Sequence, residues 1–169
     1  GPCGPRALAR LARSILPAPS MRPFLPILGL SFLLAGPAIA AVKPETAIHY
    51  RQAAYTMIGW NFGPMVQMVR GKAPWDGAAF ARHAGRVAFI APQLLEGFPE
   101  GSGSGAKTEA KPEIWTDMEG FKAKMDDFVR ESKRLAEVAR AGDETKAKEQ
   151  VKATAAACKA SHEKYRIDD

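Results

Sequence analysis

The chain has 169 residues, a length that suits a single domain. Its formal net charge is +6, from 24 Lys and Arg against 18 Asp and Glu. Residues 1–40 hold four arginines and no acidic side chain, so residues 41–169 are nearly balanced, with 20 basic and 18 acidic residues. No basic patch with interleaved aromatic residues remains, and we therefore expect no nucleic-acid partner.

Residues 21–40, MRPFLPILGLSFLLAGPAIA, have the pattern of a secretory signal peptide. Arg22 supplies the positive start, residues 24–35 are almost wholly apolar, and residues 38–40 (AIA) form a small-x-small cleavage signal. The alternative is a membrane anchor, but the apolar run is short for a span and contains a proline. We expect cleavage near Ala40, export, and no membrane contact afterwards.

Residues 1–20 lie upstream of that start, and we assign them no fold. They have the character of an over-extended reading frame or of residues left from expression. Cys3 falls in this segment, so the mature chain from Ala41 has one cysteine, Cys158. Since a lone thiol in an exported protein has no disulfide partner in its own chain, attachment to another group becomes a real possibility.

The first half of the mature chain predicts two helices and no convincing strand. The first runs from about Pro44, which suits a helix start, to about Arg70. The second begins after Asp76, an N-cap residue type, and bends or ends near Pro92. The inward stripes follow steps of three and four. They are Ile48, Gln52, Tyr55, Gly59, Phe62 and Val66 in the first helix, and Phe80, Ala84, Val87, Ile90 and Leu94 in the second.

A stretch rich in Gly, Ser and Pro, residues 96–113, predicts one long surface connection. After it, a helix is predicted from Ile114 to Ala139, ended by Ala141-Gly142. Its inward stripe is Ile114, Met118, Phe121, Met125, Phe128, Ser132, Leu135 and Ala139.

The last predicted helix is capped by Asp143 and runs to about Ile167. Its seam is Val151, Ala155, Cys158, His162 and Tyr165. The alanines around this seam have almost no side-chain volume, which leaves space that a flat apolar group could fill. Four helices joined by two short turns and one long connection predict an all-α, antiparallel four-helix bundle over residues 41–169.

The sequence CKASH, residues 158–162, is two thirds of a haem-attachment box. In a Cys-x-x-Cys-His box, two thiols bond to haem vinyl groups while the adjacent His ligates iron. Ser161 replaces the second cysteine and has no thiolate, so only one thioether, from Cys158, is expected. The motif is weak by itself, and the alternative is a buried Cys near a surface His162 on an ordinary helix.

Four motifs in order carry a more specific signal: YRQ at 50–52, NFGPM at 61–65, KPEIW at 111–115 and CKASHEKYR at 158–166. Together they resemble cytochrome c′, the class II c-type cytochromes of bacterial periplasms, over essentially all of residues 41–169. The family's box is CKACH, from which this chain departs only at Ser161. The resemblance implies a periplasmic protein with haem c held through Cys158 and with His162 as the iron ligand.

The same resemblance implies roles for other residues. Arg51 and Gln52 would approach the haem and its propionates, Tyr55 would lie over the distal side of the iron, and Arg166 would lie beside the proximal face. Glu109 and Lys111 would approach the haem edge. Two simpler alternatives remain open: Tyr55 as a core aromatic residue and Arg51 as a solvated helix charge.

The resulting functional hypothesis is a haem protein with five-coordinate iron that binds nitric oxide or carbon monoxide, transfers electrons with an unidentified redox partner, or does both. No catalytic base or nucleophile is apparent, so we expect no enzyme. The resemblance also implies a homodimer through the first two helices. The alternative is a structural or binding bundle that lost its haem through Ser161. That serine could equally be an engineered change or a sequencing error, since one nucleotide converts Cys to Ser.

Overall fold

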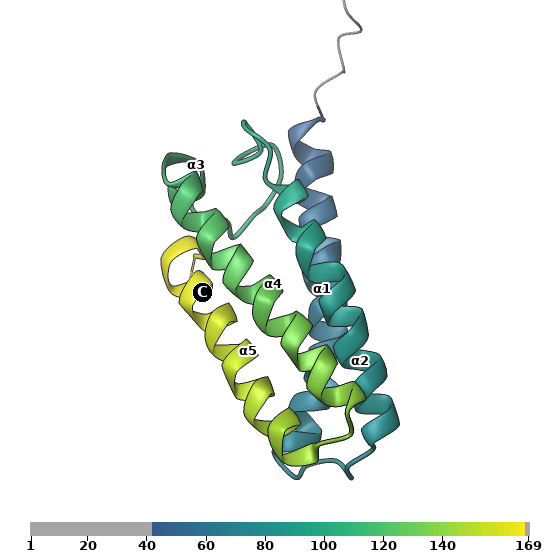
Figure 1. The fold of residues 1–169 in the computed structure, drawn as a ribbon. Coiled ribbons are helices and arrows are strands. Elements are labelled where there is room, and N and C mark those ends of the chain that lie inside the picture. Colours follow the sequence, from purple (N-terminus) through teal and green to yellow (C-terminus); the bar gives the residue numbers. More distant parts are fainter. Residues whose placement is uncertain (1–41, 168–169) are drawn as a thin grey trace, which may run out of the picture. The chain divides into compact units, whose positions relative to one another are not determined.

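The computed structural model describes residues 42–167, which form a bundle of helices (Figure 1). The elements are α1 (Pro44–Val69), α2 (Gly77–Ile90), a 3₁₀ helix η1 (Ala91–Gly97), α3 (Glu113–Thr116), α4 (Met118–Arg140) and α5 (Glu144–Tyr165). The four long helices run in alternating directions, which confirms the antiparallel four-helix bundle. The predicted signal peptide and upstream extension lie outside the described residues.

The predicted helix boundaries agree closely with the structure because the capping residues act as expected. Asp76 accepts a hydrogen bond from the Ala79 amide at 2.9 Å, and Asp143 accepts one from the Lys146 amide at 3.0 Å. At the other end of α4, Gly142 has φ +74°, a conformation that favours glycine and ends the helix.

The predicted third helix is interrupted, which the periodicity did not indicate. Asp117 has φ −131° and ψ 53°, so the short α3 ends there and α4 begins at Met118. The Asp117 side chain accepts a hydrogen bond from the Gly120 amide at 3.2 Å and so acts as the N-cap of α4. The remaining stripe from Phe121 to Ala139 is buried as predicted.

The predicted inward face of α1 was partly wrong. Gln52, Tyr55 and Gly59 are exposed, because α1 packs mainly on α2 and η1 and only slightly on α5. The buried positions are Ala47, Ile48, Arg51, Ala54, Ile58, Asn61 and Met65. The predicted stripe of the second helix is buried throughout, with its last member, Leu94, in η1.

Two further expectations need correction. In α5, Val151 and Tyr165 are buried, but Cys158 is half-buried and His162 is exposed, while Thr154, outside the predicted seam, is fully buried. The long connection is not wholly on the surface. Gly97, Phe98 and Ser102 are buried within it, and an isolated bridge joins Ala110 to Arg166.

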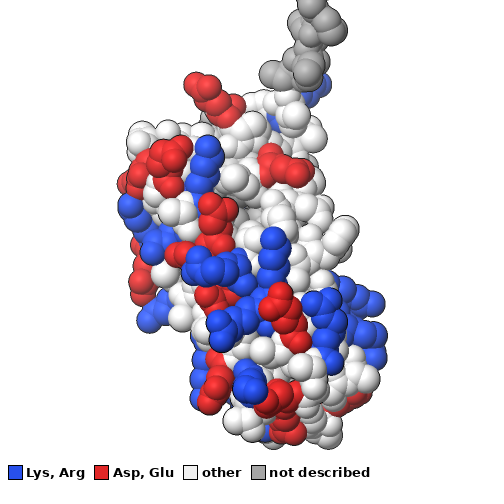
Figure 2. Space-filling view, viewed as in Figure 1, with Lys and Arg blue, Asp and Glu red and all other residues white. Residues whose placement is uncertain are grey.

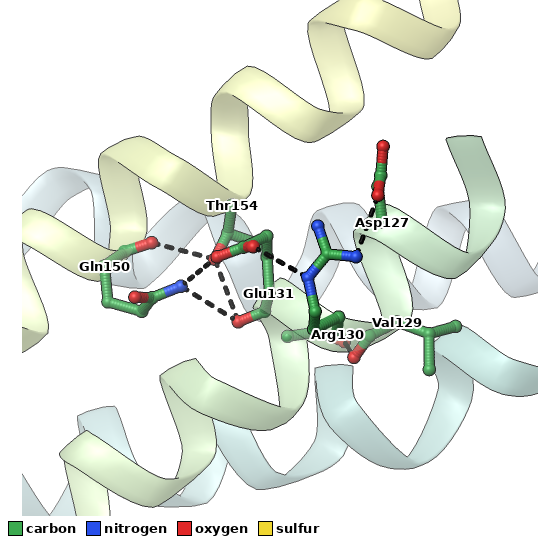
Figure 3. Close-up of polar contacts among 7 residues, drawn as sticks. Asp127, Val129, Arg130, Glu131, Gln150 and Thr154 are labelled. Atoms are coloured by element: carbon green, nitrogen blue, oxygen red, sulfur yellow. Dashed lines mark hydrogen bonds and ion pairs between the residues drawn. The ribbon is translucent and has the colours of Figure 1, made fainter. Parts of the chain in front are cut away.

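Polar side chains fix α5 against α4 (Figure 3). Gln150 donates from Nε2 to the Glu131 carboxylate at 2.7 Å and to the Glu131 carbonyl at 3.2 Å. Thr154, which is fully buried, donates to the Gln150 carbonyl of its own helix at 2.8 Å and to the Glu131 carbonyl of α4 at 3.4 Å. Every buried side-chain nitrogen and oxygen within residues 42–167 has a partner. These bonds set one register between the two helices, because a shift would leave buried polar atoms unpaired.

Lys and Arg are interspersed with Asp and Glu over the face that α4 and α5 form (Figure 2). Arg130 and Asp127 pair at 2.9 Å, and Lys148 and Glu144 pair at 2.5 Å along their helices. Such exposed pairs contribute little to stability. Within the described part of the chain, no helix is both long and apolar enough to cross a membrane.

Candidate functional site

The C-terminal half of α5 carries the thiol and the imidazole that the sequence singled out. Cys158, Ser161 and His162 lie within two turns, so they project from neighbouring positions of one helix surface. Cys158 and Ser161 are half-buried and His162 is exposed. Burial raises the pKa of the Cys158 thiol to about 11, so the thiol is neutral near pH 7.

The side chain of Tyr55, in α1, is directed toward this surface of α5. Its hydroxyl is 3.9 Å from the Met125 sulfur of α4, and its ring meets the Phe98 ring edge-on with centroids 6.5 Å apart. Burial of the hydroxyl, and next the negative charge of the Cys158 thiolate that forms at high pH, raise the pKa of Tyr55 to about 12. The residue as a whole has 37% of its surface exposed. Tyr55 and Cys158 are therefore within electrostatic reach of each other, although they are 103 positions apart in the sequence.

Arg51 is buried, with only 2% of its surface exposed, and it holds the long connection against α1. Its guanidinium donates to the carbonyls of Gly97 and Ser102, each at 3.0 Å, and to the Thr108 hydroxyl at 2.9 Å. It also lies 4.9 Å from the centre of the Phe98 ring. Within residues 42–167 no carboxylate forms an ion pair with it, and burial lowers its pKa. The alternative of a solvated helix charge is wrong for Arg51.

Gln52 and Gly97 complete this attachment of the connection. The exposed Gln52 donates from Nε2 to the Lys107 carbonyl at 2.9 Å. Gly97 lies so close to α1 that an added Cβ would be 2.6 Å from the Arg51 Cβ. Only glycine fits there without a backbone shift. The structure thus places Arg51 and Gln52 at the contact between α1 and residues 97–108.

Arg166 lies just beyond the last turn of α5, where it pairs with the long connection. Its Nε and Nη2 both contact one Glu109 carboxylate oxygen at 2.7 Å. Its amide donates to the His162 carbonyl at 3.0 Å. Glu109 is thus placed against Arg166, while the predicted approach of Glu109 and Lys111 to a haem edge stays a prediction.

Several residues around the site were not identified from the sequence. Met125 and Phe98 contact Tyr55, and Asp117 contacts the end of α5 through Tyr165. Of these residues, Asp117 could have been identified from the sequence, because an aspartate three residues before Gly120 is in the position of a helix N-cap.

A four-helix bundle whose last helix presents a cysteine and a histidine one turn apart has the architecture of the class II c-type cytochromes. A family model described as Cytochrome C' matches residues 46–166. Cytochrome c′ of Rubrivivax gelatinosus is 39% identical over 124 residues, which are 73% of this chain and 96% of that protein. The chain belongs to the cytochrome c′ family.

Solved structures agree with this assignment. Cytochrome c prime from Shewanella frigidimarina superposes with a TM-score of 0.73 at 39% identity, covering 76% of this chain and 99% of that one. A nitric oxide complex of a variant of cytochrome c prime from Alcaligenes xylosoxidans gives a TM-score of 0.70 at 34% identity, covering 76% and 99%.

Proposed function

We propose that this chain is a periplasmic haem protein that binds nitric oxide or carbon monoxide and exchanges electrons with a redox partner. Haem c would lie between α1 and α5, with one thioether to Cys158 and with His162 as the iron ligand. The observation that carries this proposal is the half-buried Cys158 one turn from His162 on α5, within electrostatic reach of Tyr55 on α1. Family membership and the nitric oxide complex of a relative support it.

The residues present fit such a group. A half-buried thiol and an imidazole one turn apart would provide one attachment point and one iron ligand. Haem would supply an iron that changes oxidation state and binds a diatomic gas. Because the pKa of Tyr55 is about 12, its phenol stays protonated near neutral pH and is a poor iron ligand. Its ring would restrict the distal side to small ligands.

Arg51 would contribute charge. It is a buried cation that forms no ion pair with a carboxylate within residues 42–167. A haem propionate is a group of opposite charge that a guanidinium stabilises. Gln52, beside it on the exposed side of α1, would provide an amide donor at the same edge.

The single thioether is tested by a pyridine haemochrome spectrum after acid–organic extraction of protein expressed with periplasmic haem-maturation factors. We expect retained haem with a band between the positions for two-thioether and free-vinyl haem. Ser161→Cys is the matched variant and should move the band to the two-thioether position, while Cys158→Ser should release the haem. Complete extraction from the wild type would instead favour the haem-depleted bundle.

We also propose that the chain forms a homodimer through α1 and α2. Large apolar side chains are exposed on this face, with Met57 at 54%, Trp60 at 76% and Phe89 at 75% of their surfaces. Hollows of about 580 and 620 Å³ lie beside them, lined mainly by α1 and α2. Exposed apolar patches of this kind mark interaction surfaces.

Sedimentation velocity tests the dimer. We expect the wild type to sediment as a dimer and Trp60→Glu to sediment as a monomer. Ala123→Glu adds the same charge on the exposed side of α4 and should leave the dimer intact. A monomeric wild type at micromolar concentration would contradict the proposal.

A further inference from the structure

We propose that Asp117 and Tyr165 are positioning residues for His162, the iron ligand of the proposed function on which this inference rests. Together with Glu109 and Arg166 they form what we call the α5 clamp. The clamp fixes the last turn of α5 against the long connection and the start of α4. It therefore determines where the imidazole can lie relative to the rest of the bundle.

Tyr165 is the centre of the clamp. It lies three residues after His162, and only 3% of its surface is exposed. Its hydroxyl donates to the Asp117 carboxylate at 2.8 Å, and its ring meets the Phe121 ring edge-on with centroids 5.2 Å apart. Packing and a hydrogen bond thus hold the same side chain, which leaves the turn that follows His162 little freedom.

Asp117 is itself fixed, so it can serve as an anchor. It caps α4 through the Gly120 amide and pairs with Lys164, whose hydrogen bond is the largest cause lowering the Asp117 pKa. The space around it is closed. A Cβ added to Gly120 would lie 2.7 Å from the Tyr165 hydroxyl. Glycine at position 120 is therefore required for the contact between Asp117 and Tyr165.

The backbone forms the second half of the clamp. The Lys111 amide donates to the Tyr165 carbonyl at 3.0 Å, and the Ile167 amide donates to the Glu109 carbonyl at 2.8 Å. The Arg166 guanidinium closes on Glu109 beside this bridge. The end of α5 thus has backbone partners in a segment more than 50 residues earlier in the chain, and a shift of the helix along its axis would break all of these bonds.

Ser161 makes this fixation important. A second thioether at that position would tie the haem to α5 within one residue of the ligand, and a serine cannot form it. With one covalent attachment at Cys158, the clamp is the structure that restricts motion of the turn on the other side of His162.

The test compares Tyr165→Phe and Asp117→Asn with the wild type in the haem-loaded protein. Tyr50→Phe is the matched control, because Tyr50 also donates to a carboxylate, that of Glu96 at 3.2 Å, but outside the clamp. Two readouts are taken: amide hydrogen exchange at Lys111 and Arg166, and the iron–histidine stretching band in the resonance Raman spectrum of the ferrous protein. Exchange at Leu135, buried in α4, reports whether each variant is folded.

Loss of one clamp hydrogen bond should speed exchange at Lys111 and Arg166 about tenfold, with Leu135 unchanged. The iron–histidine band should shift or broaden in both clamp variants and stay unchanged in Tyr50→Phe. Unchanged exchange and an unchanged band in both clamp variants would overturn the proposal. If the wild type retained no haem, the proposed function would fail. Faster exchange at Lys111 and Arg166 in the haem-free clamp variants would still show that the clamp fixes the turn of His162, and unchanged exchange would overturn that as well.

Discussion

Helix α5 meets its two neighbours in different ways. Against α4 it buries Val151, Thr154 and Tyr165 and forms a set of polar bonds with Glu131. Against α1 it makes few contacts, and the facing residues, Cys158 and Tyr55, keep part of their surface exposed. One helix therefore supplies both the tightly packed side that stabilises the bundle and the loosely packed side that carries the reactive groups.

This difference explains why the two sides should respond differently to substitution. Changes on the α4 side remove close packing or leave buried polar atoms unpaired, which lowers the free energy of unfolding. Changes on the α1 side alter groups that contribute less packing, so they should affect titration and ligand chemistry more than stability.

The largest effect is expected in the core of α4. Leu135 is fully buried, and Leu135→Ala should lower the free energy of unfolding by about 2–5 kcal/mol because it removes packed methyl groups and leaves a cavity. Urea denaturation of the wild type and variant measures this difference. A loss below about 1 kcal/mol would mean that this side is less tightly packed than the structure shows.

Arg51→Met should lower the free energy of unfolding by about 2–3 kcal/mol, because hydrogen bonds from a charged donor are lost and buried carbonyls of the connection are left unpaired. Arg51→Lys should recover only part of this, since an ammonium cannot reproduce the planar fork of donors. Denaturation gives the energies, and limited proteolysis near Ser102 should show faster cleavage in both variants. Equal stability of all three chains would contradict the role of Arg51 in holding the connection.

Thr154→Val should lower the free energy of unfolding by about 1 kcal/mol, because the hydroxyl contacts with the Gln150 carbonyl and with the Glu131 carbonyl of α4 are lost while the side-chain volume is kept. Thr145→Val is the matched control on the exposed surface of the same helix and should change stability by less than about 0.5 kcal/mol. If the two variants had equal stability, the polar bonds between α4 and α5 would not contribute as described.

The smallest effect on the free energy of unfolding is expected for Tyr55→Phe, and it is measured as a function of pH. Its pKa is raised from 10.0 to about 12 in the folded chain, so the neutral phenol favours folding. That contribution is present below pH 10 and is lost as the pH rises toward 12. Unfolding measured across this range should therefore show a steeper loss in the wild type than in Tyr55→Phe. Identical pH profiles would contradict the burial of the hydroxyl.

Much of the fold was predictable from the sequence because its signals are local. Asp76 and Asp143 cap their helices as single-residue signals, and the stripe from Phe121 to Ala139 is apolar on one face and charged elsewhere. In α1 the same reasoning selected the wrong face in part. Apolar and small residues occur on several of its sides, so the periodicity does not specify which side is packed.

The residues of the candidate site were only partly predictable from the sequence. CKASH indicated Cys158 and His162 because their chemistry and spacing are local. The burial of Arg51 was not predictable, since it depends on carbonyls and aromatic rings of a distant connection. The contact of Asp117 with Tyr165 likewise joins residues 48 positions apart, and nothing in the local sequence of either one indicates the other.

The decisive experiment is intact mass spectrometry of denatured protein recovered from the periplasm after expression with haem-maturation factors. The proposed function predicts a chain that starts near Ala41 and carries the mass of one haem, while the Cys158→Ala chain has the polypeptide mass alone. A wild-type chain of bare polypeptide mass would contradict attachment through Cys158 and would leave a bundle without covalently bound haem.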